Sequence, residues 1–324
     1  MAEPHLAQAQ DGRSHARGER HSHARRAHGA AAGTDVRLLG VALGLIAAFV
    51  VGELTAAIFS GSLALFADAG HMLTDVGALA ASIWAARLAM RPAGGVWTFG
   101  LKRAEILSAA GNGVTLVALA VVITIEAIFH LVSPAHVEGS VMIGVAIGGA
   151  VVNVAATAVL ARANRTSLNV QGAFVHLLSD LYAFLATAVA GLVIVLAGWS
   201  RADAVASLLV AALMARAAWG LLRDAGRILL QGAPEEVSLS EVRAHIGSIE
   251  HVLGVHDLHA WTLTSNVPTL SAHVVVDDDC FASGHAPQIL DALQACLGEH
   301  FDLEHATFQL EPASHVVHEH GQHP

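Results

Sequence analysis

Long apolar runs separated by short polar links fill the chain between residues 37 and 223. Each run is close to the roughly 20 residues that an α-helix needs to cross a bilayer. We therefore predict six transmembrane helices joined by short connections. The runs cover residues 37–58, 63–87, 104–131, 139–161, 170–196 and 203–223.

Beyond the Gln231-Gly232-Ala233-Pro234 segment the pattern changes to that of a soluble α+β domain. Alternating and helical periodicities follow in the order helix, strand, strand, helix, strand. Ser238, with Glu241 three residues later, forms a capping box at the first of these helices. This order predicts a small three-stranded sheet covered on one face by two helices. The predicted ranges are 238–249, 254–264, 269–276, 287–300 and 306–310.

Both ends of the chain are polar and rich in histidine. Residues 1–36 contain arginines but no apolar core of a signal peptide, so we expect a disordered tail. The histidines of the two tails either capture Zn²⁺ weakly or are solvated without a role, and the sequence leaves both readings open. The predicted division is a tail (1–36), a six-helix transmembrane domain (37–232), a cytosolic α+β domain (233–312) and a second tail (313–324).

Composition and charge agree with a membrane protein. The chain has 324 residues, of which 54% are hydrophobic and 14% charged, and its net charge of −10 does not favour nucleic-acid binding. All of the 17 lysines and arginines except Arg201 fall on one side of the predicted spans, so both termini are expected in the cytoplasm. Cys280 and Cys296 form no C-x-x-C and are expected to be reduced cytosolic thiols. Low lysine and high alanine content suggest a GC-rich bacterium, so we expect the protein in a bacterial inner membrane.

Two apolar runs carry the same polar pair. His71 and Asp75 are four residues apart, as are His176 and Asp180, so each pair lies on one face of its helix. Charged side chains inside a bilayer cost about 2.5–3.5 kcal/mol each and usually serve a function. Two histidines and two aspartates form a set that suits tetrahedral Zn²⁺. A single buried His or Asp could equally be a packing residue, but the repeated pair favours a metal site.

Two nearby patterns have less specific meanings. Asp68 lies three residues before His71, and it could tune the metal site, relay protons or cap the helix start. Gly144 and Gly148 form a G-x-x-x-G motif in the fourth run, which usually marks a close contact between helices.

Taken together, these segments resemble the cation diffusion facilitator family in its zinc-transporting branch. The matching segments are SLALFADAGHMLTD, FGLKRAEIL, HLLSD, VHDLHAWTLTS and LSAHVVV, within residues 62–276. The resemblance implies a homodimeric cation/proton antiporter with six transmembrane helices and a cytosolic ferredoxin-like, metallochaperone-like αββαβ domain. The family's transport site matches His71, Asp75, His176 and Asp180.

The resemblance also implies a metal site in the cytosolic domain. Its candidate ligands are His256, His273, Gln309 and Glu311. Some relatives have a histidine at the position of Gln309, and a neutral amide is a poor zinc ligand. His259 or His305 could take its place.

The function predicted from the sequence is export of Zn²⁺ from the cytoplasm in exchange for protons, by a transporter and not an enzyme. The expected partners are divalent metal ions, protons, the lipid membrane and a second copy of the chain, without nucleic acid. One alternative keeps the fold and exports mainly Cd²⁺, Co²⁺, Ni²⁺ or Fe²⁺. Two others change the class: a membrane-anchored metal sensor, or a membrane zinc hydrolase, which would need an open zinc position and a general base.

Overall fold

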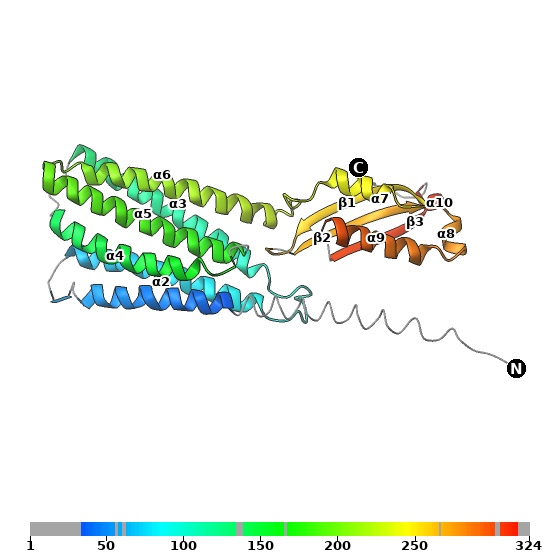
Figure 1. Ribbon diagram of the computed structural model, residues 1–324, viewed down its shortest axis with the longest axis horizontal. Helices are drawn as coiled ribbons and strands as arrows, with labels where there is room; N and C mark the ends of the chain where they lie inside the picture. Colours follow the sequence, from blue (N-terminus) through cyan, green and yellow to red (C-terminus); the bar gives the residue numbers. More distant parts are fainter. Residues whose placement is uncertain are drawn as a thin grey trace. The chain divides into compact units, whose positions relative to one another are not determined.

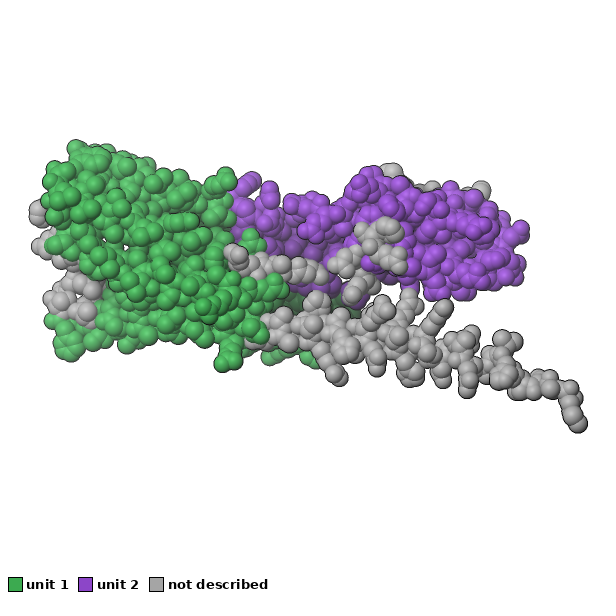
Figure 2. Space-filling model, viewed as in Figure 1, with its two compact units in different colours: residues 1–165, 169–218 green, residues 166–168, 219–324 purple. Residues whose placement is uncertain are grey.

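The chain folds into two compact units, which Figure 2 distinguishes by colour. The helical unit comprises residues 1–165 and 169–218, and the α+β unit comprises residues 166–168 and 219–324. The computed structural model describes residues 34–55, 58–59, 63–133, 139–164, 167–265, 267–301 and 305–316. The histidine-rich segments 1–33 and 317–324 lie outside the described residues.

Long helices run alongside one another in the helical unit (Figure 1). Within the described residues, five helices are long and apolar enough to cross a membrane. A further helix, α2, has 27 residues, which is also sufficient to span a bilayer. The prediction of six transmembrane helices is therefore confirmed. The helices are Thr34–Thr55, α2 (Leu63–Ala89), α3 (Ala104–Val132), α4 (Gly139–Leu160), α5 (Leu168–Ala197) and α6 (Ala202–Leu229).

The sixth helix is longer than predicted. The apolar run ends near Arg223, but α6 continues to Leu229. Arg227 in this last turn donates a hydrogen bond from Nε to the carbonyl oxygen of Ala233, at 3.0 Å, and pairs with Glu235. The apolar part of α6 therefore ends near Arg223, and the helix itself continues for about six more residues.

Apolar residues fill the interior of the helical unit. One buried cluster joins the first helix, α2, α4 and α5, and a second joins α3 to α6. Large apolar side chains such as Val51, Ile147 and Leu209 remain exposed on the outside. An exposed apolar surface on long helices is expected where lipid, and not water, surrounds the protein.

Two polar contacts fix how α2 and α5 pair. Asn169 donates from Nδ2 to the carbonyl oxygen of Ser82, at 2.8 Å, and Nε2 of His176 lies 2.8 Å from Oδ1 of Asp75. From residue 75 to residue 82 along α2, the contact partner on α5 moves back from residue 176 to residue 169. The two helices are therefore antiparallel. The Asn112 amide on α3 donates to the Ser82 hydroxyl at 3.1 Å and ties a third helix to the same point.

Glycine permits the closest approach of α4 and α5. A Cβ atom added at Gly139 would lie 2.9 Å from the carbonyl oxygen of Gly191. In the G-x-x-x-G motif, a Cβ at Gly148 would only touch Phe49 of the first helix, and one at Gly144 would meet nothing within 4 Å. The tight contact of α4 thus uses a glycine that the motif did not indicate.

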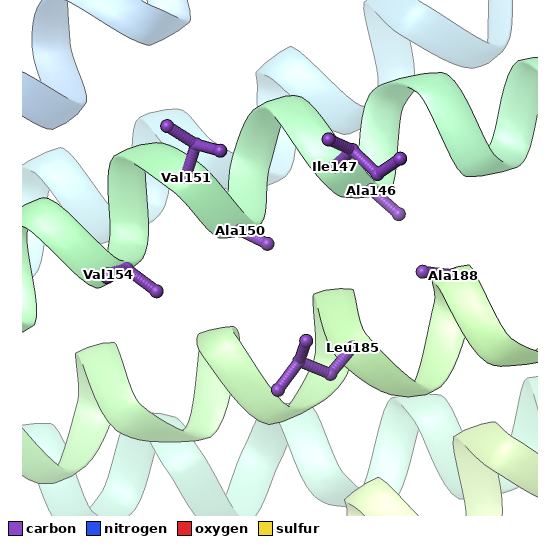
Figure 3. A pocket seen from close by; sticks show the side chains of 7 residues that line it. All are labelled: Ala146, Ile147, Ala150, Val151, Val154, Leu185 and Ala188. Atoms are coloured by element: carbon purple, nitrogen blue, oxygen red, sulfur yellow. The ribbon is translucent and has the colours of Figure 1, made fainter.

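Further along the same two helices the packing loosens. A pocket of about 280 Å³ lies between α4 and α5, and Figure 3 shows Ala150, Val154 and Leu185 pointing into the space between them. Every lining side chain is apolar, so the pocket offers no donor atom to a metal ion. The lining residues are Ala146, Ile147, Ala150, Val151, Val154, Leu185 and Ala188.

The α+β unit is built on a three-stranded sheet in the order β1-β2-β3. β1 and β2 are antiparallel, and β2 and β3 are parallel. The predicted αββαβ order is confirmed, with two one-turn helices added where no periodic pattern could have indicated them. The elements are α7 (Leu239–Gly247), β1 (Val252–Thr262), β2 (Pro268–Val276), α8 (Asp279–Ala282), α9 (Ala286–His300), β3 (His305–Pro312) and α10 (Ala313–Val316).

One face of this sheet forms the core of the unit. Leu270, Ala272 and Val274 alternate along β2 and pack with buried residues of α7 and α9, such as Val242 and Leu293. Ser238 caps α7 as predicted, because its Oγ accepts a hydrogen bond from the Glu241 amide at 3.4 Å. The opposite face carries polar side chains, including those of His273 and Gln309.

Candidate metal-transport site

Three of the predicted ligands come together where α2 meets α5. Asp75, His176 and Asp180 have exposed fractions of 2%, 2% and 7%. Asp75 lies on α2, and the other two lie one turn apart on α5, so both α5 side chains occupy the same helix face. The antiparallel pairing of the two helices brings this face against Asp75.

The distances within this group are short. His176 Nε2 lies 2.8 Å from Oδ1 of Asp75 and 3.8 Å from Oδ2 of Asp180. One donor atom from each of the three residues lies within 4.8 Å of the others. Two carboxylates beside one imidazole in an apolar bundle create an excess of negative charge that a divalent cation would neutralise.

The fourth predicted ligand, His71, belongs to α2, but its side chain lies outside the described residues, as does that of Asp68. Its backbone position can still be placed. In the antiparallel register, position 82 pairs with 169 and position 75 with 176. The same register sets position 71 level with position 180.

A β-bulge shapes a second group of polar residues in the α+β unit. His256 pairs with His273, but the next pairing joins His259 to Ser271, so β1 has one residue more than β2 in this interval. Asp257 within the bulge adopts a positive φ of 46°. Without the extra residue, His256 would lie on the core face with Leu258; the bulge brings it to the open face beside His273.

All four predicted cytosolic-domain residues meet on this open face. His256 Nε2 lies 3.2 Å from Oε2 of Glu311, and His273 Nδ1 lies 2.7 Å from Oε1 of the same carboxylate. Gln309 donates from Nε2 to Glu311 Oε1 at 2.7 Å. Glu311 is almost fully buried and connects the other three.

The prediction from sequence omitted Asp257. Its Oδ2 lies 3.0 Å from Nδ1 of His256, and His256, Asp257 and His273 bring donor atoms within 4.8 Å of one another. Asp257 directly follows His256 in the VHDLH segment, and the sequence prediction named His256 without it. Only the bulge turns the Asp257 side chain toward the histidines. The two proposed substitutes are both exposed: His259 borders the group, with Nε2 3.9 Å from Asp257 Oδ1, and His305 lies at the far end of β3 from Glu311.

The chain combines a bundle of membrane-length helices, a buried carboxylate–imidazole cluster and a small α+β domain. This combination is typical of a helical membrane transporter for cations. Residues 39–230 match the family described as the cation efflux transmembrane domain, and residues 234–313 match the cation efflux protein cytoplasmic domain. The chain belongs to the cation efflux family, also called cation diffusion facilitators, and is a multi-pass membrane transporter, not an enzyme.

Characterised relatives align over most of their length. The metal cation efflux system protein CzcD of Cupriavidus metallidurans is 37% identical over 281 residues, which cover 87% of this chain and 88% of the relative. The zinc transporter ZitB of Escherichia coli is 36% identical over 90% of this chain and 92% of its own. The cadmium, cobalt and zinc/H(+)-K(+) antiporter of Bacillus subtilis is 34% identical over 87% and 91%.

A solved structure resembles part of the chain. The metal-bound C-terminal domain of the Cupriavidus metallidurans CzcD transporter is 39% identical, with a TM-score of 0.21, and covers 23% of this chain and 99% of that domain.

Proposed function

We propose that this protein exports Zn²⁺ from the cytoplasm in exchange for protons. The observation that carries the proposal is the buried group formed by Asp75, His176 and Asp180, whose donor atoms lie within 4.8 Å of one another. Nitrogen and carboxylate oxygen donors in a tetrahedral set suit Zn²⁺ better than Mg²⁺ or Ca²⁺, which prefer oxygen alone.

His71 completes the set in this proposal. Its support is the register of α2 against α5, which sets position 71 level with Asp180 as it sets Asp75 level with His176. The two i, i+4 pairs then face each other across the helix interface. A closed set of four ligands differs from a hydrolytic zinc centre, which keeps one position for water.

Proton coupling follows from the chemistry of the ligands. A carboxylate or an imidazole must be deprotonated before it binds zinc, so the metal ion and protons compete for the same atoms. In the proposed cycle the site loads Zn²⁺ from the cytoplasm, and protons displace the ion once the site opens outward. Alternating access around a fixed site near the bilayer midplane supplies the movement.

The surrounding assembly is proposed on separate grounds. Basic residues flank the spans on one side, which supports a cytoplasmic location for both termini of a protein embedded in a bacterial inner membrane.

The α+β unit supports a homodimer, because its sheet is covered by helices on one face and open on the other. The group at His256, Asp257 and His273, with Glu311 in contact with both histidines, is proposed as a second metal site in that unit.

The identity of the metal is supported by the relatives. CzcD carries the name of a metal cation efflux protein, ZitB that of a zinc transporter, and the Bacillus protein that of a cadmium, cobalt and zinc antiporter. We assign zinc as the main substrate, with Cd²⁺ and Co²⁺ as competing ions that share its ligand preferences.

Zinc flux into inside-out vesicles, driven by an acidic lumen, tests the proposal. The Asp180→Asn variant removes a charged ligand while keeping the size of the side chain, and uptake should fall to the level of empty vesicles. Asp224→Asn, at a partly exposed carboxylate near the end of α6, is the matched control and should transport normally. Full zinc uptake by Asp180→Asn would exclude the buried group as the transport site.

The same vesicles distinguish the alternatives. A panel of Zn²⁺, Cd²⁺, Co²⁺, Ni²⁺ and Fe²⁺ identifies the preferred ion. Zinc uptake without a matching release of protons from the lumen would contradict proton exchange. A metal sensor or a zinc hydrolase would give no metal flux under any gradient.

A further inference from the structure

A third group of metal-binding side chains lies at one end of the sheet in the α+β unit. Val252 pairs with Val276 at the end of the β1–β2 ladder, so the residues just outside it, His251 and Asp277, are neighbours. The Asp277 amide donates to the His251 carbonyl oxygen at 3.2 Å. The Nδ1 atom of His251 lies 3.3 Å from Oδ2 of Asp277.

The short helix α8 brings a thiol to the same place. The Cys280 amide donates to the carbonyl oxygen of Asp277 at 3.0 Å, which holds the first turn of α8 against the strand end. Cys280 is buried and forms no disulfide. Donor atoms of His251, Asp277 and Cys280 all lie within 4.8 Å of one another.

A second histidine borders this group. The ring of His285 stacks on that of His251, with centroids 5.6 Å apart and planes at 27°. Nδ1 of His285 lies 2.8 Å from the Ser283 hydroxyl, a contact that orients the ring. His251 itself holds a positive φ of 69°, which is uncommon for a residue with a side chain and costs on the order of 1 kcal/mol.

We propose that His251, Asp277 and Cys280 bind a divalent ion of the zinc class, with the fourth position taken by His285 or by water. Sulfur, nitrogen and oxygen donors together suit Zn²⁺, Co²⁺ and Cd²⁺. Ligand atoms around a tetrahedral zinc ion lie roughly 3.5 Å apart, so small side-chain rotations would close the present arrangement around an ion.

This group is separate from the one that contains His256 and His273. His256 lies five positions after His251, which corresponds to roughly 16 Å along an extended strand. The two groups share no residue. A bound ion would connect the end of the sheet with α8 and, through His285, with the start of α9, and would stabilise this corner of the unit.

The thiol gives the site a spectroscopic signature. Cys280 and Cys296 are the two cysteines of the chain, so sulfur-to-cobalt charge transfer in the near ultraviolet reports binding at one of them and is insensitive to cobalt at other sites. Burial, with the carboxylates of Asp277 and Asp279 nearby, raises the pKa of the Cys280 thiol. A bound ion therefore has to displace the thiol proton.

The experiment is a Co²⁺ titration of the metal-stripped, full-length protein in detergent. We expect a charge-transfer band that is lost in Cys280→Ser, kept in the matched control Cys296→Ser, and removed by added Zn²⁺. The His251→Asn variant, whose new residue tolerates a positive φ, should lower the apparent Co²⁺ affinity roughly tenfold or more. A wild-type protein without the band, or a band that survives Cys280→Ser, would overturn the proposal.

A second measurement covers the case in which Cys280→Ser fails to fold. Local opening exposes even a buried thiol over time, and Zn²⁺ should slow the resulting alkylation of Cys280 in the wild-type protein, mapped by peptide mass spectrometry, and should not slow it in His251→Asn. Equal alkylation of the wild-type protein with and without zinc would overturn the site. The Asp180→Asn transport variant should retain the cobalt band, so failure of this inference is distinguishable from failure of the transport proposal.

Discussion

At the scale of single residues, the proposed transport site consists of ionisable side chains in an apolar interior, where a charge is energetically costly. Asp75, His176 and Asp180 are buried within helices that are mostly apolar. A charged residue in such a place costs several kilocalories per mole unless it is paired. In the proposed mechanism, either a zinc ion or bound protons neutralise the negative charge of the two carboxylates.

The identity of the imidazole should set the choice of metal. In His176→Asp a hard oxygen donor replaces nitrogen, which shifts the set toward ions that prefer oxygen. We expect zinc flux to fall roughly 10- to 100-fold, and Mn²⁺ flux to fall less or to rise. Competition between the two ions in proteoliposomes measures the ratio, with Ser179→Ala, at the neighbouring residue, as the control. An unchanged ratio would show that His176 does not contact the metal.

The sequence predicted part of this chemistry and missed part of it. The i, i+4 pairs depend only on helical periodicity, so His176 and Asp180 could be assigned to one face without tertiary information. Asp257 and the group around Cys280 could not, because their proximity depends on strand register and on a bulge. Periodicity does not reveal either feature.

At the scale of helices and strands, polar contacts set register and small residues set distance. Ser82 receives hydrogen bonds from Asn112 and Asn169, which connects α2 to α3 and α5. The types of the predicted elements were correct, because long apolar runs and alternating strands give strong signals. The end of α6 and the one-turn helices α8 and α10 were missed, because they follow local hydrogen bonding and not hydrophobic pattern.

A pair of equal substitutions tests the packing of α4. Gly139→Ala would place a methyl group 2.9 Å from the Gly191 carbonyl oxygen and should destabilise the protein by about 1–3 kcal/mol. Gly144→Ala on the same helix meets nothing within 4 Å and should be neutral or slightly stabilising. Thermal unfolding in detergent compares the two. A larger loss at Gly144 would show that the G-x-x-x-G motif makes the tight contact.

The cap of α7 is open to a similar test. Ser238→Ala removes the acceptor for the Glu241 amide and should lower the stability of the α+β unit by about 1 kcal/mol. Gln294→Ala, at an exposed position of α9, should have an effect near zero. Chemical denaturation followed by circular dichroism separates the two variants. Equal stability of both would mean that the cap contributes nothing measurable.

At the scale of the whole molecule, our proposals assign transport and dimer assembly to different units. The proposed transport ligands belong to the helical unit, and the open sheet face belongs to the α+β unit. The domain limits read from the sequence, 37–232 and 233–312, remain a prediction beside the family matches at 39–230 and 234–313.

This division predicts the effect of truncation. A chain that ends at Gly232 keeps the proposed transport ligands but loses the open sheet face, so its dimer fraction in detergent should fall several-fold. Light scattering coupled to size-exclusion chromatography measures the change. Removal of residues 317–324 alone is the control and should leave the dimer intact. An undiminished dimer in the shorter chain would place the interface among the membrane helices.

The bulge at Asp257 makes the metal binding proposed for the His256–His273 group sensitive to chain length as well as to residue identity. Successive side chains of a strand point to opposite faces of the sheet. Deleting one residue at the bulge would therefore move every preceding side chain of β1 to the other face. His256 would turn inward and Val255 outward, although both histidines and Glu311 would still be present in the chain. Loss of binding in this unit could therefore arise from a single-codon deletion that leaves all of its histidines and its buried glutamate untouched.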